Sequence, residues 1–384
     1  MREAALEALD RLVGYPTISA DSNRALIDDL ASRLEGAGAR VEVMADSSGA
    51  KANLWATLGP EGDGGLVLSG HTDVVPVEGQ PWTRDPFKMV EAEGRLYGRG
   101  TCDMKGFIAC CLAALPLFRT SARPVHFAFT YDEEIGCLGA QALVAVLRET
   151  GVRPAMAIIG EPTEMRVIEG HKGCCEYTTT FSGLEGHGST PDLGVNAVEY
   201  AARYVGRLLE LRDGLTRRAP EGSRFEPPWS TINVGAMTGG AAHNVIPAEA
   251  TVAWEMRPVV EADADWVKSQ LQDFVERDLL PAMQARHPDA AIHTVTEGEV
   301  AGLEPMQANA ARDLVARLTG ANTSDVVSFG TEAGLFQGLG IDTVVCGPGS
   351  IRQAHMADEF IEIQQIDACL GLLSRLAERL SSGD

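Results

Sequence analysis

Short apolar runs alternate with helical segments along most of this 384-residue chain, and this alternation constrains the fold more than any other feature. The runs at 64–70, 125–132 and 155–162 have the length and apolar character of buried strands. Residues 106–119, which lie between two of them, are apolar nearly all round and should form a buried helix. Strands and helices in alternation predict an α/β fold with a mostly parallel, doubly wound sheet.

The pattern changes near residue 174 and reverts near residue 299. Between these points the strands alternate polar and apolar residues, which is typical of strands with one exposed face. Their order with the intervening helices is βαββαβ, which predicts a small α+β domain. We therefore expect a larger α/β domain formed by residues 1–173 and 299–384, into which a smaller domain of residues 174–298 is inserted.

Charge and composition argue against several classes of partner. The formal net charge of −22 at pH 7 disfavours binding to nucleic acid or to an anionic membrane surface. The chain has no run of about 18 apolar residues, which a membrane-spanning helix would need, and its first segment lacks the apolar stretch of a signal peptide. The eight cysteines include no CxxC pair, which favours reduced thiols and predicts a cytoplasmic protein.

Histidine and acidic side chains follow the predicted sheet strands or lie in the adjoining loops. The candidates are His71, Asp73, Asp103, Glu133, Glu134, Glu161 and His355. Ligands of open α/β sheets gather at the carboxyl ends of the strands, so we expect these side chains to converge. Two histidines with several carboxylates suit two divalent cations that share a bridging carboxylate. The set therefore indicates a metallohydrolase.

His71 and Asp73 can face the same side because residues i and i+2 of a strand do so. A metal-bound imidazole usually donates its other N–H to a carboxylate, so we expect His71 to bind a metal and Asp73 to orient it. Asp103 lies in a glycine-rich turn before the buried helix. It could bridge two cations about 3.5–4 Å apart, or it could instead cap the N-terminus of that helix.

Glu133 and Glu134 are adjacent carboxylates that repel each other unless cations neutralise them. If one binds a metal, the other can act as a general base toward a water whose pKa the metal lowers. A solvated turn is the alternative interpretation of the pair. A single loop histidine such as His355 is likewise usually a surface residue. The metal hypothesis therefore depends on the agreement among all five sequence segments that contain the candidate residues.

Other classes of protein lack their sequence marks here. No GxGxxG motif opens the first strand–helix turn, as a dinucleotide-binding dehydrogenase would require. No GxSxG motif indicates a serine hydrolase. A non-catalytic protein that binds amino-acid derivatives would be expected to have lost a ligand or the base, and all of these candidates are present.

Six motifs occur along the chain in the order SGHTDVVP, GRGTCDMKG, TYDEEIG, GEPT, GHGSTP and GPGSIRQAH. With this ordered set the chain resembles the M20 metallopeptidases, also called the aminoacylase/carboxypeptidase G2 group, along nearly its whole length. Finer details look most like the acetylornithine deacetylase subgroup, namely TCDMKGF, YDEEIGCLGA, HKG, FGTEAGLF and CGPGSIRQAHMADEF.

The resemblance implies a site for two zinc ions, for which Co²⁺ or Mn²⁺ could substitute. The implied metal ligands, with Asp103 bridging, are His71, Asp103, Glu134, Glu161 and His355. Asp73 would orient His71, and Glu133 would activate the attacking water and later protonate the leaving amine. The peptide bond after the bridging aspartate is typically cis in this family, which here would be Asp103–Met104.

The resemblance also implies that the inserted domain acts as a lid and pairs two subunits into a homodimer. His187 would reach across the dimer to polarise the substrate carbonyl. Arg257 would bind the substrate α-carboxylate, which suits a bidentate guanidinium, and Asn244 would add a polar contact. Thr331 and Glu332 would line the substrate pocket, and we expect Glu332 to meet a cationic side-chain amine.

The implied reaction is hydrolysis of N2-acetyl-L-ornithine to acetate and ornithine in arginine biosynthesis. The expected partner is a small N-acyl amino acid, with no nucleic acid and no membrane. Three alternatives would share the metal machinery and differ only in the pocket: a succinyl-diaminopimelate desuccinylase, a general aminoacylase and a dipeptidase.

Overall fold

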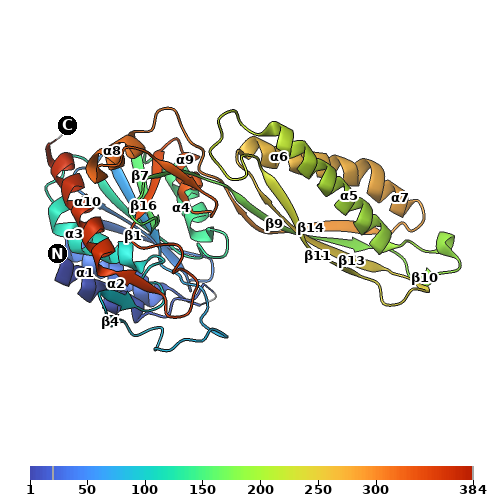
Figure 1. The fold of residues 1–384 in the computed structure, drawn as a ribbon, viewed down its shortest axis with the longest axis horizontal. Coiled ribbons are helices and arrows are strands. Elements are labelled where there is room, and N and C mark those ends of the chain that lie inside the picture. The colour runs from blue at the N-terminus through green and yellow to red at the C-terminus, as the bar shows by residue number, and fades with distance from the viewer. Residues whose placement is uncertain (20, 383–384) are drawn as a thin grey trace. The chain divides into compact units, whose positions relative to one another are not determined.

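The computed structural model describes residues 1–19 and 21–382, which form two compact units (Figure 1). Unit 1 comprises Met1–Gly170, Pro305–Val326 and Thr331–Asp384, and unit 2 comprises His171–Glu304 and Val327–Gly330. The inserted segment therefore extends beyond the expected range of 174–298 at both ends. Residues just outside the expected range pair with each other, since the backbones of His171 and Leu303 exchange two hydrogen bonds of 3.0 Å.

Unit 1 is built on an eight-stranded sheet in the order β1-β2-β6-β3-β7-β16-β8-β15. Its strands are β1 (Arg40–Ala45), β2 (Ala52–Leu58), β3 (Leu66–His71), β6 (Val125–Thr130), β7 (Met156–Pro162), β8 (Ile168–His171), β15 (Asp325–Val327) and β16 (Asp342–Gly347). The four central strands β6, β3, β7 and β16 are parallel, whereas β1 and β2 are antiparallel to their neighbours. The prediction of a mostly parallel sheet is confirmed for its centre, and the antiparallel edge was not expected.

Helices cover both faces of this sheet (Figure 1). They are α1 (Arg2–Val13), α2 (Arg24–Gly36), α3 (Lys105–Phe118), α4 (Leu138–Thr150), α8 (Ala310–Thr319), α9 (Ala333–Gln337) and α10 (Ile363–Ser382). Helix α3 contacts β3 and β7 and is itself covered by α1, α2 and α10. Helices α4 and α9 pack together, with α4 against β2 and β6 and α9 against β7 and β16. Nearly every residue of α3 is buried, as its apolar sequence predicts.

The parallel centre of the sheet brings the candidate residues to one edge. His71 ends β3 and Glu161 lies near the end of β7, while Glu133 follows β6 and His355 follows β16. These four strands are neighbours, and the carboxyl ends of neighbouring parallel strands lie side by side. The order of the strands therefore assembles residues that are up to 284 positions apart in the sequence.

A three-stranded antiparallel sheet also belongs to unit 1 and was not expected from the sequence. Its order is β17-β5-β4, with the bounds β4 (Val90–Ala92), β5 (Arg95–Tyr97) and β17 (Phe360–Glu362). Phe360 pairs with Tyr97 and Glu362 with Arg95. This pairing places the turn that carries Asp103 beside the loop that carries His355.

Unit 2 has a four-stranded antiparallel sheet in the order β11-β13-β9-β14. Its principal elements are β9 (Cys174–Ser182), α5 (Ala197–Leu215), β11 (Thr231–Gly239), β13 (Glu249–Arg257), α6 (Glu261–Phe274) and β14 (Ala291–Val300). Smaller elements are β10 (Gly186–His187), β12 (Val245–Ile246), α7 (Leu280–Gln284), two 3₁₀ turns at Pro191–Leu193 and Thr216–Arg218, and a π-helical turn at Val275–Leu279. Burial alternates along β9 and β13, because one face packs on the helices.

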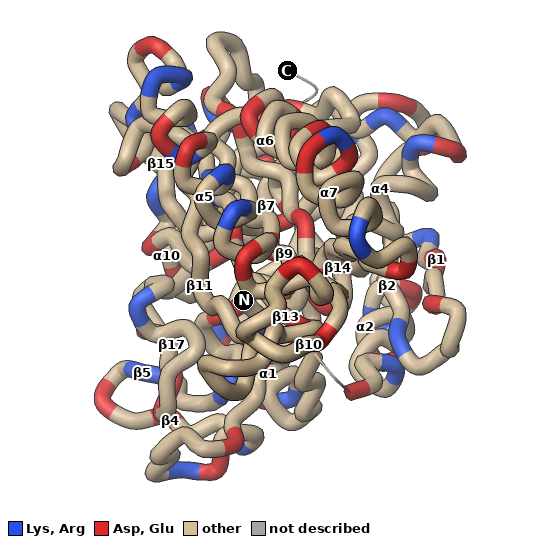
Figure 2. The backbone as a smooth tube through the Cα atoms, turned by 90° about the vertical axis from the view of Figure 1, so that its right-hand side faces the viewer, with Lys and Arg blue, Asp and Glu red and all other residues tan. Residues whose placement is uncertain are grey.

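Acidic residues are not confined to one element of the molecule. Figure 2 shows Asp and Glu at many places along the backbone of both units, interspersed with Lys and Arg. Within residues 1–19 and 21–382, none of the helices combines the length and the apolar character that crossing a membrane requires.

Candidate metal centre

His71 is held in the tautomer that suits a metal ligand. Its Nδ1 lies 2.9 Å from the backbone carbonyl of Asp73 and 3.5 Å from the Asp73 carboxylate. A carbonyl oxygen can only accept, so Nδ1 must carry the hydrogen. The opposite nitrogen, Nε2, then faces Asp103 Oδ1 at 3.1 Å and Glu161 Oε1 at 3.9 Å. A lone pair facing two carboxylates is favourable only when a proton or a cation lies between them.

Asp103 lies between the two histidines. Its Oδ1 faces His71, and its Oδ2 lies 3.4 Å from His355 Nε2. The same His355 nitrogen lies 2.9 Å from Glu134 Oε2. The carboxylate thus presents one oxygen to each histidine, which is the arrangement that a bridging ligand needs. The Asp103–Met104 peptide bond is cis, as the family resemblance implied.

The remaining carboxylates fit a cation in the same place. The ligand atoms of His71, Glu133 and Glu161 lie within 4.8 Å of one another, as do those of His71, Asp103 and Glu134. Glu161 Oε1 is buried and has no hydrogen-bond donor. A buried polar atom without a partner is costly, so this oxygen supports a cation as its missing partner. The donor set of imidazoles and carboxylates is one that zinc accepts.

The shifted pKa values of the cluster indicate that its carboxylates lack positive charge nearby. Burial and the charge of Asp103 raise the pKa of Glu161 well above its usual range, and burial raises the pKa of Glu133 to about 8. Burial alone would lower the pKa of His71, but hydrogen bonds to Asp103 and Asp73 raise it well above 6.5. Hydrogen bonds to Asp103 and Glu134 raise the pKa of His355 to about 10. Without a metal, protons therefore take the place of cations between these groups.

Asp73 connects the candidate base to the candidate ligand. Besides its contact with His71, it accepts the backbone N–H of Glu133 at 3.1 Å and that of Glu134 at 3.3 Å. Its Oδ2 also accepts a hydrogen bond of 2.7 Å from Ser19 Oγ. One carboxylate thereby orients the imidazole of β3 and the loop after β6, so the positions of His71 and Glu133 are coupled.

Sequence reasoning missed Ser19 and Lys51. Ser19 supplies the third hydrogen bond to Asp73. The Lys51 ammonium contacts the backbone carbonyl of Ser19 and the carboxylate of Asp132, the residue before Glu133. Neither residue belongs to a motif, and both are more than 50 positions from one of the groups they support. A single sequence contains no signal that would have found them.

His187 and Asn244 lie together in unit 2, on the paired strands β10 and β12 and the turn before β12. Ser189 donates its backbone N–H to His187 Nδ1 at 3.2 Å, and its hydroxyl lies 2.7 Å from the same atom. Because a backbone N–H can only donate, Nδ1 is the acceptor and Nε2 carries the hydrogen. Gly188 donates to the Asn244 carbonyl at 2.8 Å, and a Cβ at 188 would come within 3.0–3.1 Å of the Asn244 backbone. Glycine therefore permits the close approach of the two loops.

Arg257 ends strand β13 and is half-buried. Its Nε and Nη2 both donate to Glu255 Oε2, at 3.0 and 2.7 Å, and Nη2 lies 3.7 Å from Glu176. The fork of the guanidinium is therefore engaged by a neighbouring carboxylate. A substrate carboxylate would have to share or displace Glu255, so its binding by Arg257 stays a prediction.

Glu332 does not occupy the place expected of a substrate-binding residue. Its side chain is 1% exposed, and its two oxygens accept hydrogen bonds from Ser69 at 2.5 Å and Thr130 at 2.8 Å. These hydroxyls lie on β3 and β6, two residues before His71 and three before Glu133. The burial of this carboxylate and its two hydrogen bonds within unit 1 argue against direct contact with a cationic amine, and that contact stays a prediction. The adjacent Thr331 is fully buried as well, and its substrate role stays a prediction.

Replacing Glu332 by alanine is expected to lower the free energy of unfolding by about 1–3 kcal/mol, because two buried hydroxyls lose their acceptor. The KM values for a cationic and a neutral N-acyl amino acid should change by the same factor. Urea unfolding and steady-state kinetics measure the two effects, with the exposed Glu78→Ala as the control variant. A rise in KM confined to the cationic substrate would show that Glu332 does contact the substrate amine.

Known proteins resemble this chain over its length. The family profile described as Peptidase family M20/M25/M40 matches residues 67–379. An acetylornithine deacetylase of Pasteurella multocida is 36% identical over 388 residues, which cover 98% of this chain and 98% of that protein. One of Proteus mirabilis is 38% identical over 382 residues, which cover 97% and 96%. The structure of an M20 family metallo-carboxypeptidase from Sulfolobus solfataricus matches with a TM-score of 0.74 at 16% identity, covering 98% of this chain and 99% of that one, and so shares its fold.

Proposed function

The chain belongs to peptidase family M20/M25/M40, and on this premise we propose that it hydrolyses N2-acetyl-L-ornithine to acetate and ornithine. The observation that carries the proposal is the full-length similarity, at 36–38% identity, to relatives named acetylornithine deacetylase. The gathered carboxylates and imidazoles of unit 1 support a hydrolytic centre in the same chain. The proposal includes a cytoplasmic location and a role in arginine biosynthesis.

The residues of the centre would hold two cations, which we propose to be zinc. His71, Asp103 and Glu161 would bind one, and Asp103, Glu134 and His355 would bind the other. The unpartnered oxygen of Glu161 and the position of Asp103 between the two histidines support this assignment. Bound divalent cations would supply Lewis acidity to the substrate carbonyl and would lower the pKa of a water.

Glu133 would move the proton in the reaction. It would accept a proton from the water that attacks the acetyl carbonyl carbon, and it would deliver that proton to the amide nitrogen as the C–N bond breaks. Acetate and the free amine are then the products. Asp73, which accepts the backbone N–H of Glu133, would keep this carboxylate in place.

Unit 2 would contribute substrate contacts in a homodimer. His187 of the partner subunit would donate its Nε2–H to the substrate carbonyl oxygen and stabilise the charge that develops there. The tautomer that Ser189 imposes on this imidazole supports the role, because it leaves Nε2–H free to donate. Arg257 would bind the α-carboxylate, and Asn244 would add a polar contact.

A substrate panel tests the proposal. The metal-free protein is reloaded with zinc, and kcat/KM is measured for N2-acetylornithine, N-succinyl-diaminopimelate, N-acetylmethionine and a neutral dipeptide. We expect N2-acetylornithine to be preferred by at least about tenfold, with one acetate released per turnover, since correct pocket contacts discriminate about 10–200-fold. Preference for any of the other three compounds would replace the proposed substrate while leaving the metal assignment intact.

A further inference from the structure

Arg99 and Glu359 form a buried ion pair that the proposed reaction does not use. Arg99 Nη1 lies 2.8 Å from Glu359 Oε2, and each side chain is 1% exposed. Burying two charges removes both from water, so such a pair is weak evidence for stability alone. Both partners also make hydrogen bonds to the segments that carry Asp103 and His355.

Glu359 binds the turn that carries Asp103. Its Oε2 accepts the backbone N–H of Gly100 at 3.0 Å in addition to the Arg99 guanidinium. Its Oε1 accepts the backbone N–H of Cys102 at 2.9 Å and that of Asp103 itself at 3.0 Å. A carboxylate, which accepts at both oxygens, is the side chain that can satisfy all of these donors. Glu359 thus determines where the backbone of Asp103 lies.

Arg99 connects the same carboxylate to the loop that carries His355. Its Nη1 donates to the Met356 carbonyl at 3.3 Å, and its Nη2 donates to Gln80 Oε1 at 2.5 Å. Gln80 in turn donates from Nε2 to the His355 carbonyl at 2.8 Å. The ion pair thereby joins the backbones of Asp103 and His355 through a short chain of hydrogen bonds.

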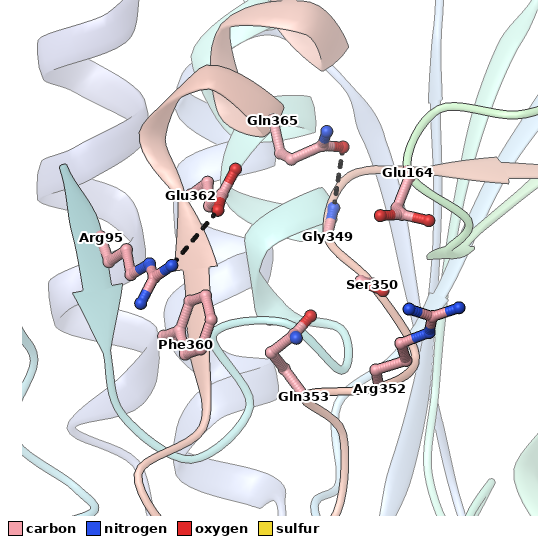
Figure 3. Close-up of a pocket in the computed structure, with 9 residues that line it drawn as sticks. All are labelled: Arg95, Glu164, Gly349, Ser350, Arg352, Gln353, Phe360, Glu362 and Gln365. Atoms are coloured by element: carbon pink, nitrogen blue, oxygen red, sulfur yellow. Dashed lines mark hydrogen bonds and ion pairs between the residues drawn. The ribbon is translucent and has the colours of Figure 1, made fainter.

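The His355 loop is also held on either side of the histidine, because Cys102 Sγ donates to the Ser350 carbonyl at 3.3 Å and Thr83 donates its N–H and hydroxyl to the Asp358 carboxylate at 3.0 and 2.8 Å. A pocket of about 190 Å³ lies against it, lined among others by Gly349, Ser350 and Gln353 (Figure 3). The dashed contact in Figure 3, in which Gln365 accepts the Gly349 N–H at 3.2 Å, lies at the start of the loop. His355 itself is 54% exposed, with a left-handed backbone at φ 62°. A loop beside a hollow and with an exposed ligand depends on its hydrogen bonds for its position.

We propose that Glu359 and Arg99 are positioning residues that set the separation of Asp103 and His355, and so control one of the two cation sites. The site concerned is that of Asp103, Glu134 and His355. The site of His71 and Glu161 shares Asp103 but does not contain His355, so it should respond less. This inference rests on the proposed two-cation centre.

The test is zinc titration of the metal-free Glu359→Gln variant by calorimetry, with the bound metal counted independently. We expect one zinc to bind about 10–100-fold more weakly, as for other residues that support metal ligands, and the other to be weakened to a smaller extent, because the second site shares Asp103 but not His355. Amide hydrogen exchange should become faster at Gly100, Cys102 and Asp103. The milder Gln80→Ala variant should weaken the same single zinc to a smaller extent, and it serves if Glu359→Gln fails to fold.

Glu169→Gln is the matched control, because Glu169 is a buried carboxylate that pairs with Arg312 at 2.7 Å in the same unit. It should bind both zinc ions normally, so a general loss of stability is distinguished from loss of positioning. Wild-type affinity for both ions in Glu359→Gln, or equal weakening of both, would overturn the inference. If the wild type binds fewer than two zinc ions, the proposed two-cation centre fails instead. Unchanged amide exchange at residues 100–103 of Glu359→Gln would then separately refute the positioning role.

Discussion

The Glu133→Gln variant is expected to lose about 10²–10⁴-fold in kcat, the usual contribution of a positioned general base. Glutamine has nearly the same shape but cannot accept a proton. Burial raises the pKa of Glu133 to about 8 in the metal-free protein, so this carboxylate has a strong tendency to take up a proton. The measurement is steady-state hydrolysis of N2-acetylornithine by zinc-loaded protein, with KM expected to stay within about threefold.

The adjacent Glu134→Gln provides the control for this prediction. Glu134 contacts His355 at 2.9 Å, so its loss should reduce the number of zinc ions bound, whereas Glu133→Gln should retain two. The ligand atoms of Glu133 also lie within reach of His71 and Glu161. Loss of zinc from Glu133→Gln would therefore identify Glu133 as a ligand, and a kcat close to that of the wild type would remove it from the mechanism.

Removal of the metal is expected to abolish hydrolysis and to make stability fall as pH rises. The pKa of Glu133 is raised to about 8 by burial and that of His355 to about 10 by its carboxylate partners. A group whose pKa is higher in the folded protein holds more protons there than in the unfolded chain, so the free energy of unfolding decreases through that interval. The interval runs from about pH 4.5 to 8 for Glu133 and from about pH 6.5 to 10 for His355.

Groups outside the centre oppose this trend, because burial lowers the pKa of His126 and His171 to about 4 and that of Lys105 to about 7, so their contributions to stability rise with pH in part of this range. The aspartates of the centre do not act in this range. Histidine neighbours lower the pKa of Asp103 despite its burial, and His71 does the same for Asp73. Their contribution is complete above the unfolded value of about 3.8 and is lost only below it. The groups of the metal centre should therefore contribute a loss on the order of a few kcal/mol between about pH 5 and pH 8 in the metal-free protein.

Urea unfolding at several pH values, with and without zinc, measures this effect. Zinc competes with protons for the same ligands, so the zinc-loaded protein should not become less stable over this range. Glu133→Gln without metal should show a shallower pH dependence than the wild type without metal. Equal pH dependences of the metal-free Glu133→Gln variant and the metal-free wild type, or full hydrolysis of the substrate after chelation, would contradict the metal assignment.

The gathering of the candidate ligands could be predicted because it follows from strand order. His71, Glu133, Glu161 and His355 follow β3, β6, β7 and β16, and apolar runs of strand length are visible in the sequence. Once these strands are parallel neighbours, their carboxyl ends meet. The motif resemblance added which residue is expected to bridge and which is expected to act as the base, because periodicity alone does not distinguish these roles.

Residues that support the site could not be predicted in the same way. Glu359 and Glu332 lie in segments that carry the family resemblance, but nothing in these segments shows that each is buried and bonded to groups more than 200 positions away. The pairing of His171 with Leu303 likewise joins residues that are far apart in the sequence, so no local pattern near either residue indicates it. A long-range hydrogen bond leaves no periodic trace in the residues around it.

By itself, the sequence determined the alternation of strands and helices, and with it the sheet edge where His71, Glu161 and His355 would lie. It did so because apolar periodicity and residue order are local properties that one chain displays directly. Only the tertiary structure decided which acidic groups face these ligands and which face a buried hydroxyl or amide. That choice depends on burial and on donors from distant segments, as the contrast between Glu161 and Glu332 demonstrates.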